Sequence, residues 1–442
     1  MKPIKLTFLG LFIGLTLLWL LADDILVEQL GFWPLRTLMV HYSGILGMGA
    51  MSVAVFLATR PVRVEPLLDG LDKTYRLHKW LGISALVLAI FHWGWAQIPK
   101  WLVGYGWLEK PARRGARQVH EGLLGWLQGK RGFAEDIGEW AFYAAALLIV
   151  LALIKRFPYR WFFKTHRWLA LAYLVLVVHS VILMPAGYWS SPLGLVMGLL
   201  LLAGTIGACM SLSHRVGRKH KVVGRIEQLT YHKDNRVLRV GIALDGPWPG
   251  HQAGQFAFVT FDEQEGPHPF SISSAWCNDG KLAFSIKGLG DYTSSLPDKL
   301  KQDDSVTVEG PYGCFDFKGR KNGQIWVAGG IGIAPFIGRL QALAETGGGG
   351  NVELFYSTSA PDQVFIDKIR QLAERARVRL HVLVTSEDGR LTPERLRQMA
   401  PSWKGSDIWF CGPAGFGHDL RDDLISRGLA PQDFHQELFN MR

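Results

Sequence analysis

Cysteine is scarce in this 442-residue sequence, and the four cysteines are widely separated: Cys209, Cys277, Cys314 and Cys411. No two of them have the spacing of a zinc or iron–sulfur site, and disulfide bonds are not expected. The sequence also lacks a loop of the form D-x-[DN]-x-[DN]-G, so calcium control through an EF-hand is not indicated. What is abundant is apolar surface: the hydrophobic fraction is 48% and there are 17 tryptophans.

This apolar excess is confined to the first half of the chain, in runs long enough to cross a bilayer, for which about 20 residues suffice. No small-residue cleavage site follows the first run and two aspartates come directly after it, so we expect a span and not a cleaved signal peptide. The sequence predicts six membrane spans, at about residues 4–22, 35–58, 75–98, 137–154, 166–185 and 192–211.

The distribution of lysine and arginine orients these spans, because basic residues collect on the cytoplasmic side. They precede the first span, follow the sixth, and occupy the second-to-third and fourth-to-fifth connections, whereas connections 23–34 and 184–192 contain none. Both termini are therefore predicted to be cytoplasmic, in a bacterial inner (plasma) membrane. The net charge of +10 is explained by these flanks and does not indicate nucleic-acid binding.

One loop does not follow this pattern. Residues 99–136 are basic but lie outside the membrane in this topology. Their 110–133 portion could lie flat on the outer membrane surface as an amphipathic segment.

Two of the predicted spans carry a pair of histidines each: His78 and His92 in one, His166 and His179 in the other. Fourteen residues of helix return to within about 40° of the starting face, roughly 21 Å further along. Thirteen residues leave His179 about 140° from His166, so the second helix must bend or unwind, or the two ligand sites must differ in azimuth. Polar groups inside apolar helices are costly and tend to be functional. We predict two bis-histidine haem b sites, His78/His166 near the inner face and His92/His179 near the outer face; no CxxCH attachment motif is present.

From about residue 220 the pattern changes to short strands broken by glycine and proline, which predicts a small antiparallel β-barrel. After about 321, strands alternate with helices, as in a parallel, doubly wound sheet that binds nucleotides at its carboxyl edge. We therefore expect a membrane α-helical bundle fused to an antiparallel β-barrel domain and an α/β doubly wound domain, with boundaries at 1–213, 220–320 and 321–442.

Four short motifs in the soluble half carry a resemblance. They are His268-Pro-Phe-Ser-Ile-Ser-Ser274, Ile286-Lys-Gly-Leu-Gly-Asp-Tyr-Thr293, Gly329-Gly-Ile-Gly-Ile-Ala-Pro335 and Cys411-Gly-Pro413. The first two resemble the flavin-binding segments, and the last two the nicotinamide nucleotide motifs, of the ferredoxin–NADP reductase superfamily. Together with the four histidines, in the same order and spacing, the chain resembles a prokaryotic member of the NADPH oxidase/ferric reductase family.

This resemblance implies that the barrel binds FAD and that the α/β domain binds NAD(P)H. It implies that Ser271 contacts flavin N5, that His268, Lys287 and Thr293 contact the pyrophosphate, that Cys411 lies beside the nicotinamide, and that Phe439 stacks on the flavin. The implied FAD contacts are His268, Pro269, Phe270, Ser271, Ile272, Ser273, Ser274, Ile286, Lys287, Gly290, Tyr292, Thr293 and Phe439. The implied nucleotide contacts are Gly329, Gly330, Ile331, Gly332, Ala334, Pro335, Ser357, Thr358, Arg390, Cys411, Gly412 and Pro413.

The predicted function is transmembrane electron transfer from cytosolic NAD(P)H through FAD and two haems to an acceptor at the outer face. O₂, giving superoxide, is the first candidate acceptor, and Arg36 resembles the family's arginine near the outer haem. In eukaryotic oxidases a further histidine lies one turn beyond the outer ligand of the third span, whereas here that position is Ala96. A ferric chelate is the alternative, because the basic loop 99–136 could attract anions. A quinone or a periplasmic partner enzyme is a second alternative, although no obligatory protein partner is predicted.

The position that usually selects the nucleotide contains Tyr356-Ser-Thr-Ser359, without an arginine, while Arg390 could approach from the next loop. We expect a slight preference for NADPH, with NADH usable. His41, on the second span, is expected to be a packed polar residue.

Overall fold

The computed structural model describes residues 2–23, 31–110, 126, 129–154 and 156–437. It divides into a helical unit, mainly residues up to 216, and a second unit, mainly residues from 217 onward, and each is described by itself. Phe439 and most of the segment 110–133 lie outside the described residues.

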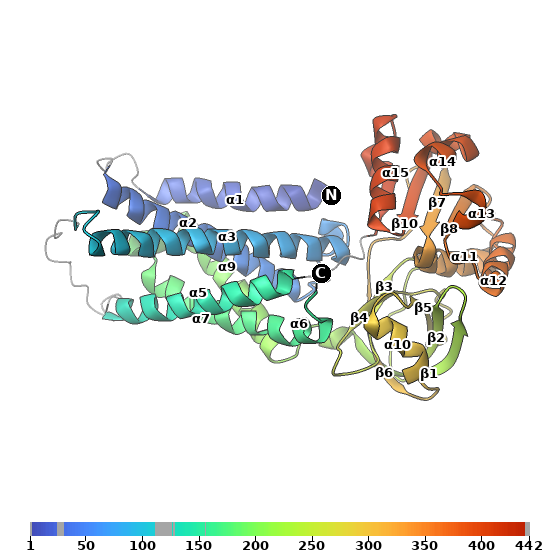
Figure 1. The fold of residues 1–442 in the computed structure, drawn as a ribbon, viewed down its shortest axis with the longest axis horizontal. Coiled ribbons are helices and arrows are strands. Elements are labelled where there is room, and N and C mark those ends of the chain that lie inside the picture. Colours follow the sequence, from blue (N-terminus) through green and yellow to red (C-terminus); the bar gives the residue numbers. More distant parts are fainter. Residues whose placement is uncertain (1, 24–30, 111–125, 127–128, 155, 438–442) are drawn as a thin grey trace. The chain divides into compact units, whose positions relative to one another are not determined.

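The helical unit contains the predicted number of candidate membrane spans (Figure 1). Among the described residues, six helical segments are long and apolar enough to cross a membrane. Five are single helices, and the fifth in chain order consists of two helices joined at Arg167. The helices are α1 (Lys2–Ala22), α2 (Phe32–Ala58), α3 (Leu71–Gly104), α5 (Arg131–Leu153), α6 (Tyr159–His166), α7 (Trp168–Leu183) and α9 (Pro192–Leu212).

The core of this unit lies between α1, α2, α7 and α9. Tyr173 of α7 is wholly buried there, and its hydroxyl forms a 2.8 Å hydrogen bond with that of Ser52 on α2. A Cβ atom at Gly204 of α9 would overlap the Tyr173 ring, so a glycine at that position permits the close packing. A second cluster packs Leu77, Leu81 and Ala85 of α3 against α2, which fixes the helix that carries His78 and His92.

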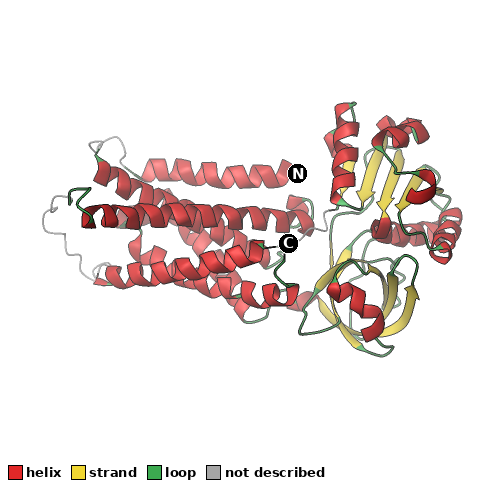
Figure 2. Ribbon diagram, in the orientation of Figure 1, coloured by secondary structure: helices red, strands yellow, loops and turns green. Residues whose placement is uncertain are grey.

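The second unit begins with an antiparallel six-stranded sheet (Figure 2). Its order is β4-β3-β6-β1-β2-β5, and a bridge between Ile272 and Phe284 joins the segment after β4 to β5, the two ends of that order. Ile226, Val240, Val259 and Phe284 are among the side chains that fill the interior. The strands are β1 (Lys221–His232), β2 (Val237–Leu244), β3 (Phe256–Thr260), β4 (His268–Ser271), β5 (Lys281–Lys287) and β6 (Ser305–Tyr312), with α10 (Asp291–Lys299) between β5 and β6.

A parallel five-stranded sheet follows, in the order β11-β10-β7-β8-β9. All its neighbouring strands are parallel, so their carboxyl ends share one edge. The strands are β7 (Gly323–Gly329), β8 (Val352–Thr358), β9 (Arg379–Val384), β10 (Ser406–Cys411) and β11 (Phe434–Gln436). The helical elements around them are η3 (Gly330–Ile333), α11 (Ala334–Thr346), α12 (Gln363–Arg375), α13 (Thr385–Asp388), α14 (Pro393–Met399) and α15 (Ala414–Ser426).

The predicted fold class is therefore confirmed: six membrane-type helical segments, an antiparallel β domain and a doubly wound α/β domain. Three details were not predicted. The helix α3 extends to Gly104, beyond the end of its apolar run, and the short strands β4 and β11 and the helix α10 carry too few periodic residues to be recognised.

Candidate functional site

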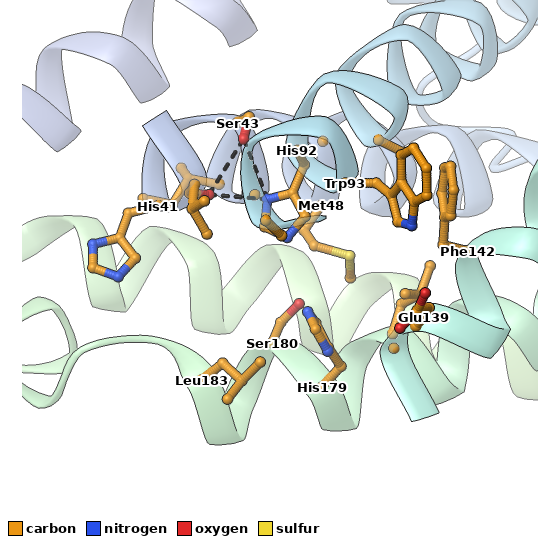
Figure 3. A pocket seen from close by; sticks show the side chains of 18 of the residues that line it. His41, Ser43, Met48, His92, Trp93, Glu139, Phe142, His179, Ser180 and Leu183 are labelled. Carbon is orange, nitrogen blue, oxygen red and sulfur yellow. Dashed lines mark hydrogen bonds between the residues drawn. The ribbon is translucent and has the colours of Figure 1, made fainter. Parts of the chain in front are cut away.

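The outer histidine pair comes from two different helices. His92 lies on α3 and His179 on α7, and their ring centres are 6.3 Å apart with the ring planes at 76°. Figure 3 shows both rings entering the same cavity. The helical unit thus brings together two residues that are 87 positions apart in the sequence.

Each ring of this pair is fixed by a hydrogen bond at its Nδ1 atom. His92 Nδ1 lies 3.0 Å from the carbonyl oxygen of Val40, and His179 Nδ1 lies 2.8 Å from that of Ala134. Since a carbonyl can only accept, each Nδ1 must carry the proton, and each Nε2 is left with its lone pair. Metal-bound histidines are usually oriented in this way.

The inner pair repeats the arrangement. His78 of α3 and His166 of α6 have ring centres 5.9 Å apart at an interplanar angle of 70°. His78 Nδ1 lies 2.8 Å from the carbonyl oxygen of Ala54 on α2. Three of the four imidazoles are therefore held by a backbone carbonyl of a neighbouring helix.

These distances test whether the pairs fit a metal. An imidazole nitrogen lies about 1.1 Å from its ring centre and about 2 Å from a bound metal, so two rings on opposite sides of one metal have centres about 6.2 Å apart. Both pairs are close to this spacing. No group of three or more His, Cys, Asp or Glu side chains that could hold a metal ion occurs in the described part of the chain. The residues therefore fit a metal with two protein ligands and the remaining ligands from a porphyrin.

Glycines keep space free beside the outer pair. A Cβ atom at Gly138 of α5 would overlap the His179 ring, and one at Gly44 of α2 would lie 3.3 Å from His92 Cε1. Neither glycine needs an unusual backbone conformation, because both lie within helices. Their role is to leave room for the two rings.

The helix that carries the second pair is interrupted between its two histidines. The helix α6 ends at His166, Arg167 forms a turn, and α7 begins at Trp168. The His166 ring before this turn faces His78, and the His179 ring after it faces His92, both on the continuous helix α3.

The outer pair lies in a cavity of about 290 Å³ between α2, α3, α5 and α7. Arg36 lines it and donates a hydrogen bond to the carbonyl oxygen of Ala96, at 3.1 Å. The charged side chains among its lining are Arg36, Lys100 and Arg131, and the carboxylates Glu135, Asp136 and Glu139. The described residues that line the cavity thus carry three charges of each sign.

An acidic residue of α5 was missed by the sequence analysis. Glu139 accepts hydrogen bonds from Gln97 of α3, at 2.9 Å, and from the hydroxyl of Tyr143, at 2.6 Å. Trp93, which donates to Tyr143 at 3.2 Å, stacks on Phe142 with ring centres 5.7 Å apart (Figure 3). A carboxylate inside an apolar span is itself a signal of function and could have been recognised from the sequence.

His41 lines the same cavity but is turned away from the histidine pair (Figure 3). Its ring packs edge-on against Tyr188, with centres 5.7 Å apart, and Tyr188 in turn donates a hydrogen bond to Asp23. The prediction that His41 is a packed polar residue agrees with this position.

In the barrel, the flavin-motif residues divide between the interior and the surface. Ile272 is fully buried, and the Ser273 and Ser274 hydroxyls are bonded to the main chain of Ala283, so these three side chains stabilise the barrel. Ser271 ends β4 opposite Phe256 of β3. His268 begins β4, next to Pro269 and Phe270.

The His268 ring is neutral at physiological pH. It stacks on Tyr292 with ring centres 4.5 Å apart, and burial lowers its pKa to about 4. Glu265 Oε1 lies 3.6 Å from Nε2, beyond hydrogen-bonding distance. His268 therefore contributes an uncharged aromatic ring, and no positive charge, to the predicted phosphate site.

The second flavin segment joins the end of β5, where Ile286 is buried, to the start of α10. The Thr293 hydroxyl accepts from the Leu289 and Gly290 amides, at 3.1 and 3.2 Å. Lys287 is half-buried, and burial, with a smaller effect of Arg236, lowers its pKa.

The two nucleotide motifs meet at the carboxyl edge of the parallel sheet, where β7 and β10 are neighbours. A Cβ atom at Gly329 would lie 2.7 Å from the Pro413 ring, and one at Gly332 would overlap the Cys411 carbonyl group. Gly330 has a φ of +57°, which favours glycine. The remaining residues of the first motif, Ile331, Ala334 and Pro335, lead into α11.

Cys411 and the predicted nucleotide-selecting residues are only partly available to a ligand. The Cys411 side chain is fully buried in this conformation, and burial raises its pKa well above the ordinary value. Thr358 is buried, and its hydroxyl bonds to Ala360. Ser357 is the last residue but one of β8 and pairs with Gly329, whereas Arg390 is exposed in the connection that follows β9 and α13.

Comparison with protein families gives three matches in chain order. Residues 43–177 match a ferric reductase like transmembrane component, residues 228–315 an FAD-binding domain, and residues 326–422 an oxidoreductase NAD-binding domain. The first match contains His78, His92 and His166, and His179 lies just beyond it. Each match falls on the part of the chain with the corresponding fold.

Two of the similar curated proteins are named as components of oxygenases. The chain is 28% identical over 195 residues to a toluate 1,2-dioxygenase electron transfer component of Pseudomonas putida, covering 42% of this chain and 58% of the relative. It is 26% identical over 228 residues to a propane 2-monooxygenase reductase component of Rhodococcus jostii, covering 48% and 60%. The chain thus spans less than two thirds of the length of these relatives.

Among solved structures, the flavohem-like FAD/NAD binding domain of a nitric oxide dioxygenase from Vibrio cholerae is similar at 21% identity and a TM-score of 0.43. The similarity covers 49% of this chain and 97% of that one.

Proposed function

Because the chain belongs to the NADPH oxidase/ferric reductase family, in which a ferric reductase-like transmembrane domain is fused to FAD-binding and NAD-binding domains, we propose that it moves electrons from cytosolic NAD(P)H to an acceptor at the outer face of a bacterial plasma membrane. When bound, FAD and two haems b supply the conversion of a hydride into single electrons and their passage through the bilayer. The main support for this proposal is that the helical unit contains two pairs of facing imidazole rings, His78/His166 and His92/His179.

The proposed role of the four histidines is to ligate the two haems. Val40, Ala134 and Ala54 accept the Nδ1 protons of His92, His179 and His78 through their carbonyl groups, which leaves the Nε2 lone pair of each ring available for a metal. Gly44 and Gly138 leave the space that the outer rings require. This chain therefore contributes ligand orientation and an apolar surrounding.

At the cytosolic end, the proposed role of the second unit is to hold two dinucleotides. The Thr293 hydroxyl orients the loop before α10, and glycines 329, 330 and 332 let a phosphate approach the main chain where β7 passes into η3 and α11. Ser271 is placed at the end of β4, where it would meet a flavin ring. Cys411 must become exposed if it is to contact a nicotinamide, because its side chain is buried here.

For the acceptor we propose O₂, giving superoxide. An outer-sphere electron transfer to O₂ needs an accessible haem edge and little specific binding. The balanced charge of the outer cavity favours this acceptor over an anionic ferric chelate, which positive charge would attract. Of the seven basic residues of loop 99–136, Arg113, Arg114 and Arg117 lie outside the described residues, whereas Lys100 and Arg131 line the cavity together with three carboxylates.

The test uses purified protein supplied with FAD and haem. NADPH and NADH are oxidised in turn with air, without oxygen, and with ferric citrate, and reduction of a superoxide-reactive dye is compared with and without superoxide dismutase. We expect dismutase-sensitive dye reduction and little anaerobic turnover. Ferric citrate reduction that is equally fast without oxygen would assign the chelate as acceptor. Failure of both would direct attention to a quinone or a partner protein.

For the electron donor we propose NADPH with NADH as a slower substrate. Arg390, exposed at the carboxyl edge of the sheet, is the cation available for a 2′-phosphate. Replacement by glutamine is expected to raise KM for NADPH and to leave KM for NADH unchanged.

A further inference from the structure

Two cationic side chains, Arg236 and Lys287, lie near each other where the barrel is next to the parallel sheet. Only Lys287 was predicted to bind a ligand. Arg236 lies in the turn between β1 and β2, at a φ of +55°. The register of β2 with β5 places Val237 opposite Lys287, and the Gly288 amide donates to the Arg236 carbonyl at 3.0 Å. Arg236 thus lies next to the segment that the family resemblance assigned to a pyrophosphate.

The guanidinium group of Arg236 is directed toward the amino end of α10. It donates to the Ser294 hydroxyl at 3.1 Å, in the first turn of that helix. A Cβ atom at Gly288 would lie 3.5 Å from the same guanidinium, whereas no atom lies within 4 Å of one at Gly290. The helix therefore begins beside open space with a cation close by, and the positive end of the helix dipole together with that charge favours an anion.

Lys287 is the second cation, and it lies beside the nucleotide motif that begins at Gly329. Its ammonium nitrogen lies 3.9 Å from the position that a Cβ atom would take at Gly330. Burial and, to a lesser extent, Arg236 lower its pKa. Among the residues that the structure describes, neither Arg236 nor Lys287 has a carboxylate within 4 Å. Two neighbouring cations without a counter-charge are an arrangement that a bound anion would stabilise.

We propose that Arg236 joins Lys287 in one subsite for the pyrophosphate of a dinucleotide, in which the Arg236 guanidinium supplies positive charge beside the first turn of α10. The inference rests on the proposed function, since FAD and NAD(P)H are the dinucleotides which that function requires. Arginine suits this role because its planar group donates two hydrogen bonds to one phosphate.

The experiment measures binding, so it needs neither haem nor turnover. Full-length protein with Arg236→Gln is titrated with FAD by flavin fluorescence and, once loaded with FAD, with NADP⁺ by calorimetry. We expect the Kd of one dinucleotide to rise about tenfold or more and its dependence on salt to weaken. Riboflavin, which has no phosphate, should bind the variant and the wild type equally. The dinucleotide that is affected identifies the pyrophosphate.

Two variants complete the test. Arg225→Gln removes an exposed arginine that pairs with Asp245 and should change neither Kd. Arg236→Lys keeps the charge and should restore part of the affinity. Values of Kd for FAD and NADP⁺ within twofold of the wild type in Arg236→Gln would overturn the proposal. So would a lower Tm of the ligand-free variant with an equal loss of FAD, riboflavin and NADP⁺ binding, since that result assigns Arg236 a structural role.

Discussion

The nitrogen at which each imidazole is hydrogen-bonded determines what its other nitrogen can do. His92 and His179 are each bonded through Nδ1 to a carbonyl oxygen of another helix. Each Nε2 therefore keeps its lone pair, in a pair of rings whose centres are 6.3 Å apart. The same arrangement at His78 shows that two distant sites in one bundle share this orientation.

Replacing His92 or His179 by leucine removes one of the two proposed haem ligands of the outer pair. We expect the haem content to fall from two to one per chain, with the inner pair unaffected, as measured by the pyridine haemochrome assay. His41→Leu is the control, because His41 lines the same cavity but faces Tyr188. Full acceptor turnover in His92→Leu or His179→Leu would contradict the assignment.

Gly138→Ala tests the space beside His179 without touching a ligand. The added methyl group would overlap the ring, so the ring must turn or α5 must move away from α7. We expect at least half of the outer haem to be lost, and a shift in the reduced spectrum of what remains. Gly132→Ala lies on the same helix with no atom within 4 Å of the added Cβ, and it should behave as the wild type. Equal haem content in both variants would refute the role given to Gly138.

His268 gives the barrel a defined response to pH. Its pKa is about 4 in the folded protein because of burial, and about 6.5 when exposed. Between these values the unfolded chain binds the proton first, so stability is complete above pH 6.5 and is lost as the pH falls toward 4, by up to about 3 kcal/mol. Melting curves at pH 6.5, 5.5 and 4.5 should show a shallower pH dependence for His268→Phe. The exposed His418→Phe should keep the wild-type dependence, and an unchanged slope in His268→Phe would be the contrary result.

Among helices and strands, what the sequence predicts depends on how periodic each element is. Six long apolar runs could be read directly, and so could the alternation of strands and helices after residue 321. The short strand β4 could not, since it has four residues and includes Pro269. The strand β11, with three residues, is defined by its pairing with β10.

The same limit applied to the site. The four histidines could be selected because polar residues are rare in apolar spans, and the glycine motifs because their spacing is distinctive. The role of Arg236 depends on the register of β2 with β5, and that of Gly138 on the packing of α5 against the His179 ring. Neither the strand register nor the helix packing can be predicted from the local sequence. Glu139 differs, since its position in an apolar run could have been noticed.

The loops after β7 and β10 contact each other. Disrupting this contact should weaken binding of the nicotinamide dinucleotide more than binding of FAD. A Cβ atom at Gly332 would overlap the Cys411 carbonyl group and lie 2.8 Å from the Gly412 nitrogen. In Gly332→Ala the loops after β7 and β10 must separate, at a cost of about 1–3 kcal/mol. We expect the Kd of NADP⁺ to rise about tenfold while FAD binding is retained, by titration of the FAD-loaded protein. Gly415→Ala, which meets no atom within 4 Å, serves as the control, and equal affinities in the two variants would contradict the role of this contact.

For the whole molecule, the proposed function assigns one half of a reaction to each of the two units. The helical unit contains facing imidazoles and lacks any group of three metal-binding side chains in the residues described, which suits metals that bring their own ring of ligands. The second unit contains glycine loops at a sheet edge and cations beside a helix start, which suit dinucleotides. Neither unit alone explains why both occur in a single chain, whereas electron transfer from one cofactor set to the other does.

The most direct test of this account is anaerobic addition of NADPH to the purified chain loaded with FAD and haem, followed by absorption spectroscopy. We predict that the flavin band bleaches and that a b-type haem spectrum corresponding to two reduced haems per chain appears. A bleached flavin with no haem reduction, or a chain that binds fewer than two haems, would contradict it.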